Sequence, residues 1–175
     1  MELFSILGSY STVSVYRKQV QNTDLRKLVA LKKLNVKSFD SEKINLAINE
    51  VKILSIIKHE NIINFNGCFV WNGRFFIEME YADAGTLAEF LANLLKPLEE
   101  IEILALFVQI VSAVVYLHDQ NIIHRDIKTT NIFLNKQGFI KLGDFGISKI
   151  LDVQPDAQSF VGTPIYICPE IVSLF

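Results

Sequence analysis

The chain has 175 residues, of which 50% are hydrophobic and 21% charged, so it can bury a sizeable core. A formal net charge of −2 provides no basic face, and we expect no nucleic-acid partner. The two cysteines, Cys68 and Cys168, favour a reducing, cytoplasmic setting over a disulfide-stabilised fold. The first residues lack the basic start and apolar stretch of a signal peptide, and we expect no membrane association.

The first half of the chain has the hydrophobic alternation of a small sheet. Strands are predicted over residues 2–8, 12–20 and 27–34, with turn residues between them. A helix is predicted over 40–58, capped by Asp40 or Ser41. Its apolar face comprises Ile44, Ala47, Ile48, Val51 and Leu54. Two further strands, 62–70 and 74–80, are joined by Asn72-Gly73, a strong hairpin signal.

The second half begins with helical patterns. Helices are predicted over 86–95 and 99–118. The apolar run from Leu104 to Leu117 is interrupted by Gln109 and Ser112, and it looks too short to span a bilayer, so we expect a buried helix. A sheet with one inserted helix, followed by helices, indicates the α+β class.

Four polar residues follow on two loops, separated by the short apolar strand 132–134. They are Asp126, Lys128, Asn131 and Asp144. Transfer of a phosphoryl group needs a carboxylate to orient the attacking hydroxyl, a cation on the transferring phosphate, and oxygen ligands for Mg²⁺. Each motif alone would be an ordinary polar turn, but their order and spacing together match a known pattern of phosphoryl-transfer sites, and the prediction of such a site rests on that match.

The strings His124-Arg125-Asp126 and Asp144-Phe145-Gly146 resemble the motifs of eukaryotic protein kinases. Lys128 and the later Gly162-Thr163-Pro164 resemble the serine/threonine branch, and the wider strings resemble the NIMA-related kinases. The resemblance implies a bilobal fold, with a five-stranded antiparallel small lobe carrying one helix over residues 1–81. A mainly helical large lobe would occupy 82–175, incomplete because the chain stops soon after the activation segment.

The same resemblance implies ATP and Mg²⁺ as cofactors and a protein as substrate. Asp126, Lys128 and Asn131 would be catalytic, with Asn131 and Asp144 as metal ligands. Lys32 would hold the α- and β-phosphates in an ion pair with Glu50, because neighbouring Lys33 points to the opposite face of the strand. The remaining nucleotide contacts would come from Ile6, Gly8, Val13, Ala30, Glu80, Ala82 and Phe133.

The glycine-rich loop departs from the family pattern, since Gly8 is kept while Ile6 and Ser11 replace its other two glycines. A backbone that approaches phosphate closely normally uses glycine, so a weakly active or inactive interaction module is the alternative interpretation.

For regulation, the resemblance implies phosphorylation of Ser159 by an upstream kinase, with Arg125 as the partner of the phosphate. Thr163 would instead bond Asp126 and Lys128. Family likeness also allows a centrosomal or ciliary location. The chain ends at Phe175, so we expect the helix over 99–118 to lose part of its cover, and the chain to aggregate readily.

Overall fold

The computed structural model describes residues 2–7, 12–19, 26–34, 41–150 and 166. The chain forms two compact units, the first of residues 1–56 and 63–81, the second of residues 57–62 and 82–175. Residues 57–62 thus belong to the second unit, although they lie in sequence between a helix and a strand of the first.

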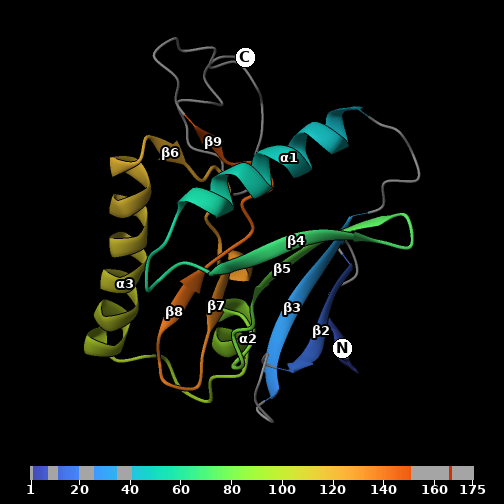
Figure 1. Ribbon diagram of the computed structural model, residues 1–175. Helices are drawn as coiled ribbons and strands as arrows, with labels where there is room; N and C mark the ends of the chain where they lie inside the picture. The colour runs from blue at the N-terminus through green and yellow to red at the C-terminus, as the bar shows by residue number, and fades with distance from the viewer. Residues whose placement is uncertain (1, 8–11, 20–25, 35–40, 151–165, 167–175) are drawn as a thin grey trace. The chain divides into compact units, whose positions relative to one another are not determined.

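The first unit is a five-stranded antiparallel sheet with one helix, as the sequence predicts (Figure 1). The strand order is β1-β2-β3-β5-β4. The strands are β1 (Glu2–Leu7), β2 (Thr12–Gln19), β3 (Arg26–Leu34), β4 (Phe65–Trp71) and β5 (Arg74–Glu80). Strand β4 begins three residues later than predicted, because Ile62 pairs in parallel with Leu142 in the second unit.

The turn between β4 and β5 confirms the hairpin prediction. Asn72 and Gly73 both have positive φ, 49° and 68°, and the flanking pair is Trp71 with Arg74. Two consecutive left-handed residues match the right-handed twist of the strands, and asparagine followed by glycine adopts them at low cost. The hairpin places β5 beside β3, with Met79 opposite Ala30 and Ile77 opposite Lys32.

Helix α1 (Ser41–Ile56) packs beside β4, but its buried face differs from the prediction (Figure 1). Leu54 is buried as expected, but Ile48, expected on the same face, is 60% exposed, and Glu50 and Ile53 are buried instead. A buried carboxylate needs a partner. The rotation of α1 that brings Glu50 to Lys32 therefore decides which apolar side chains of the helix are buried.

The second unit contains two helices and two pairs of short antiparallel strands, β6 with β9 and β7 with β8. Its elements are α2 (Leu87–Ala92), α3 (Glu100–Asp119), β6 (Ile122–Ile123), a 3-10 turn (Thr129–Asn131), β7 (Ile132–Leu134), β8 (Ile140–Leu142) and β9 (Lys149–Ile150). The described part of this unit is therefore mixed rather than mainly helical, because short strand pairs fix the ends of the two polar loops.

Helix α2 begins with a capping box. The Glu89 N–H donates to Thr86 Oγ1, and the Thr86 N–H donates to Glu89 Oε2. The bond that the carboxylate accepts from the Thr86 N–H, and next the one from the Thr86 hydroxyl, lower the pKa of the Glu89 carboxyl. The helix ends at Ala92, three residues before the predicted end, since Asn93 caps it and Pro97 follows.

Helix α3 carries a polar seam on one side, formed by Gln109, Ser112 and Tyr116 at helical spacing. The seam holds residues 58–61. The Lys58 N–H donates to the Tyr116 hydroxyl at 2.9 Å, and Ser112 Oγ lies 3.3 Å from His59 Nε2.

Gln109 also reaches strand β8. Its Oε1 accepts hydrogen bonds from Asn61 Nδ2 and from the Ile140 N–H, both at 3.0 Å. The Leu142 N–H donates to the Asn61 carbonyl oxygen at 2.8 Å. Strand β8, which leads to Asp144, is thus fixed to α3 through Gln109 and Asn61.

Much of the remaining surface of α3 is apolar and exposed, so the predicted burial is wrong, while the expected exposure of its apolar faces is confirmed. Within the helix only Ala113 and Leu117 are buried. The exposed side chains are Ile101, Ile103, Leu104, Phe107, Val108, Val111 and Val115. Among the described residues α3 is also the one helix long and apolar enough to cross a membrane, although the sequence run looked too short. Its seam, bonded to the rest of the unit, favours a helix of a globular fold.

The exposed face of α3 makes a testable prediction about solubility. Apolar surface in water costs roughly 25 cal/mol per Å², so the 175-residue chain should self-associate. Replacing Phe107 and Val108, 57% and 64% exposed, by glutamine should shift the chain toward monomer in light scattering. Glutamine at the buried Leu117 should instead lower the melting temperature. A wild-type chain that stays monomeric at high concentration and binds no hydrophobic dye would contradict the account.

Candidate functional site

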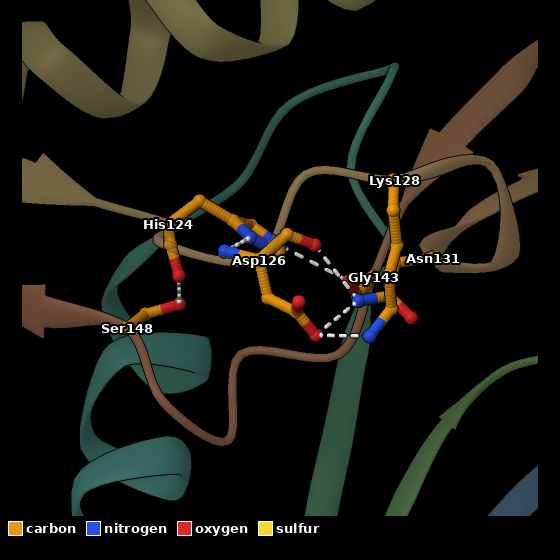
Figure 2. A network of polar contacts seen from close by, with 6 residues as sticks. All are labelled: His124, Asp126, Lys128, Asn131, Gly143 and Ser148. Carbon is orange, nitrogen blue, oxygen red and sulfur yellow. Dashed lines mark hydrogen bonds and ion pairs between the residues drawn. The ribbon is translucent and has the colours of Figure 1, made fainter. Parts of the chain in front are cut away.

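Asp126 is the centre of a polar network in the second unit (Figure 2). Its Oδ2 lies 2.8 Å from Lys128 Nζ and accepts a hydrogen bond from Asn131 Nδ2, also at 2.8 Å. The Asp126 side chain is 11% exposed and that of Lys128 is 21% exposed. The carboxylate is therefore held in one orientation by two donors, one of them charged, while its surroundings stay partly open.

Asn131 joins the two polar loops. Its Nδ2 donates to the Asp126 carbonyl oxygen as well as to the carboxylate, and its own carbonyl accepts the Gly143 N–H at 2.9 Å. Asn131 is 5% exposed and ends the 3-10 turn that precedes β7. One buried residue therefore holds Asp126 on one side and the residue before Asp144 on the other.

His124 makes a second connection between the loops. Its Nδ1 accepts a hydrogen bond from the Asp126 N–H, which leaves Nε2 as the donor to the Gly143 carbonyl at 3.0 Å. The ring meets Phe145 edge to face, with centroids 4.8 Å apart. Burial lowers the pKa of the His124 imidazole, and the bond to Gly143 and the Asp144 and Asp126 carboxylates oppose this less strongly. The ring is therefore neutral near pH 7.

The residues after Asp144 return to the same loop. Ser148 Oγ donates to the His124 carbonyl at 3.0 Å (Figure 2), and Arg125 Nε donates to the Ile147 carbonyl at 2.6 Å. Arg125 and Asp144 have positive φ, 67° and 60°, a conformation uncommon for residues with a Cβ. Strand β6, just before the first polar loop, pairs with strand β9, just after the second.

In the first unit the structure pairs Lys32 with Glu50. Lys32 Nζ lies 2.7 Å from Glu50 Oε1 and 3.0 Å from Oε2. Their side chains are 11% and 3% exposed. The ammonium is thus held at a defined point on β3, because a carboxylate on α1 balances its charge away from bulk water.

The predicted nucleotide-contact residues fall in both units. Ala30 is buried on β3 beside Met79, and Glu80 ends β5. Glu80 Oε2 accepts bonds from the Asn64 N–H and Nδ2, while its own N–H donates to the Asn64 carbonyl. In the second unit, Ala82 is buried and Phe133 forms a bridge with Thr86.

Other predicted site residues are described in part or not at all. Ile6 lies on β1 and Val13 on β2, where the backbone pairing is described. Gly8, Ser159 and Thr163 lie outside the described residues. Their assigned roles stay predictions.

A family model described as "protein kinase domain" matches residues 2–174. The chain belongs to the protein kinase domain family. The match extends over both units and all the motifs above.

Among curated relatives, this kinase domain is 45% identical over 154 residues to probable serine/threonine-protein kinase nek3 of Dictyostelium discoideum, covering 83% of the chain and 14% of the relative. Identity to Nek8 of Danio rerio is 40% over 166 residues, covering 94% of the chain and 23% of the relative. Identity to serine/threonine-protein kinase TAO1-A of Xenopus laevis is 41% over 175 residues, covering 98% of the chain and 17% of the relative. The resemblance to NIMA-related kinases is confirmed, and the chain spans less than a quarter of these relatives' length.

The sequence analysis missed several residues that hold the candidate site in place. Asn61 and Gln109 fix β8, and Ser148 ties the segment after Asp144 to His124. Gln109 was visible in the sequence as a polar residue inside an apolar run. Asn61 and Ser148 gave no pattern, because their partners lie 48 and 24 residues away.

The lowered pKa of His124 predicts a pH dependence of stability. Below the ordinary pKa of about 6.5, the unfolded chain takes up a proton that the folded unit does not. The free energy of unfolding therefore decreases as the pH is lowered. This fall stops below the folded pKa, and its slope is at most about 1.4 kcal/mol per pH unit. Denaturant unfolding between pH 7.5 and 5 measures it.

The matched variants are His124→Gln, which removes the buried ring, and His118→Gln, which changes an exposed histidine on α3. His124→Gln should flatten the dependence on pH, and His118→Gln should keep it. Equal slopes in the wild type and His124→Gln would show that His124 does not cause it.

Proposed function

We propose that this chain carries the site of an ATP-dependent protein serine/threonine kinase. The observation that carries the proposal is the Asp126 carboxylate held by Lys128 and Asn131, with Asn131 also bonded to the residue before Asp144. Membership of the protein kinase domain family supports it, and the relatives are named serine/threonine-protein kinases. The substrate would be a serine or threonine hydroxyl of a protein.

Asp126 would accept a hydrogen bond from the substrate hydroxyl and orient its oxygen for attack, taking up its proton as the phosphoryl group is transferred. Lys128, beside the same carboxylate, would stabilise negative charge that develops on the transferring group. The donors on Asp126 fix its orientation, so little rearrangement would be needed during the reaction.

The donor set after β8 and in the 3-10 turn fits Mg²⁺. Asn131 donates to Asp126 through Nδ2, which leaves the amide oxygen as a ligand of the type that Mg²⁺ prefers, and Asp144 offers a carboxylate that is exposed. Bound MgATP would supply the phosphoryl group and a metal charge that neutralises the phosphate oxygens. Asn131 and Asp144 would hold it from the second unit.

In the first unit, Lys32 would bind the α- and β-phosphates, with Glu50 fixing the ammonium. Glu80 and Ala82 would contact adenine through the backbone. The bonds between the Glu80 side chain and Asn64 support this, because they occupy that carboxylate and fix the backbone at the end of β5.

A second candidate is a kinase-like module with little or no catalytic activity that acts through protein contacts. The glycine-rich loop favours it, since Gly8 is the one glycine kept where the family pattern has three. The two candidates differ in phosphoryl transfer and share the fold.

The variant Asp126→Asn tests the proposed chemistry. It keeps the shape and the bond from Asn131 but removes the negative charge that orients the hydroxyl, so transfer of labelled phosphate to a generic acceptor protein should fall at least about 100-fold. Nucleotide affinity should change little, because Asp126 contacts the acceptor and does not hold the metal.

Asp119→Asn, at the exposed C-terminal end of α3, is the matched control and should transfer phosphate at the wild-type rate. Wild-type turnover by Asp126→Asn would show that the assignment is wrong. A folded wild-type chain without any transfer would favour the inactive module.

A further inference from the structure

Ser148 is a buried serine whose hydroxyl has a defined task. It is 1% exposed, and its Oγ donates to the His124 carbonyl oxygen at 3.0 Å. Both groups are buried. Loss of the hydroxyl would therefore remove a hydrogen bond from the His124 carbonyl oxygen where water cannot replace it, which costs free energy.

This bond is one of two that hold the chain on either side of Asp144, and the two together are called the bracket below. At one end the His124 imidazole donates to the Gly143 carbonyl, and at the other the His124 carbonyl accepts from Ser148. His124, in the loop of residues 124–131 that we call the catalytic loop, therefore holds residues 143 and 148 at once (Figure 2). The bond from Arg125 Nε to the Ile147 carbonyl lies between the two ends and reinforces the second.

The residue inside the bracket needs such support. Asp144 has a φ of 60°, which brings its Cβ close to the backbone and is normally adopted by glycine. A non-glycine residue keeps this conformation when its surroundings fix the chain on both sides. The Gly143 end is fixed twice, by His124 and by Asn131. The other end depends on Ser148, Arg125 and the short β6–β9 pair.

We propose that Ser148 is a positioning residue, whose hydroxyl fixes residues 144–148 on the backbone of the catalytic loop and so holds the Asp144 carboxylate in place for MgATP. The inference rests on the proposed function for its catalytic consequence. Its structural part, the bracket, stands on the bonds alone. Ser148 acts through His124 and touches no reacting group.

The test compares Ser148→Ala with Ser148→Thr, which keeps a hydroxyl, and with Ser112→Ala, which loses a half-buried serine hydroxyl bonded to His59. Amide hydrogen exchange is followed in the full chain by mass spectrometry. Ser148→Ala should speed exchange in residues 144–150 by about tenfold and leave β7, β8 and α3 unchanged. Ser112→Ala should not affect 144–150.

Steady-state phosphoryl transfer gives the catalytic readout. The KM for MgATP should rise by about tenfold in Ser148→Ala and return to within about twofold of wild type in Ser148→Thr, with the KM for the protein acceptor little changed. If Ser148→Thr does not fold, the contrast between the two alanine variants decides.

Two results would overturn the bracket: unchanged exchange in 144–150, or exchange that quickens equally throughout the second unit. Absence of any transfer by the wild type would refute the proposed function, while the exchange pattern would still decide whether Ser148 holds this segment.

Discussion

The hydrogen bonds of the buried Asn131 amide and carbonyl are the constraint on which the candidate site depends. They hold Asp126 and Gly143, which lie on different loops, to one point. A buried carboxamide must form its hydrogen bonds within the protein. The bonds of Asn131 therefore restrain both loops and the asparagine itself. His124 also joins the two loops: its ring bonds the backbone of Asp126 and Gly143, and its carbonyl oxygen accepts a bond from Ser148. Asn131 and His124 thereby fix the loops that carry Asp126 and Asp144, the two carboxylates that the proposed phosphoryl transfer would use.

Helix α3 supports these loops from one side and is unusual on the others. Its polar seam fixes residues 58–61 and β8 by directional bonds, so the strand that leads to Asp144 does not depend on apolar contact alone. The rest of its surface is apolar and open to solvent. One helix can therefore be long and apolar enough to cross a membrane and still be bonded along one side to the rest of its unit.

Much of the fold could be predicted from local patterns. Asn72-Gly73 specified its hairpin because the turn chemistry is local, and the alternation of residues 27–34 specified β3. Apolar periodicity alone misplaced part of the buried face of α1, since it cannot register that Glu50 is buried through its ion pair with Lys32, 18 residues away. That pair was predicted from the family resemblance and not from the periodicity. The chemistry was indicated by the resemblance that Asp126, Asn131 and Asp144 carry. Gln109 stood out as a polar residue in an apolar run, but its partners could not be predicted. Asn61 and Ser148 gave no signal, because long-range bonds leave no periodic pattern in a sequence.

The most direct test of the central claim, that these residues form a MgATP site, is calorimetric titration of the folded chain with ATP, with and without Mg²⁺. The account predicts binding of one nucleotide that tightens with Mg²⁺ in the wild type. Asp144→Asn should bind ATP but lose most of this gain, because it removes a metal ligand and leaves Lys32 in place. No binding by a chain shown to be folded, or equal affinity with and without Mg²⁺, would contradict the account.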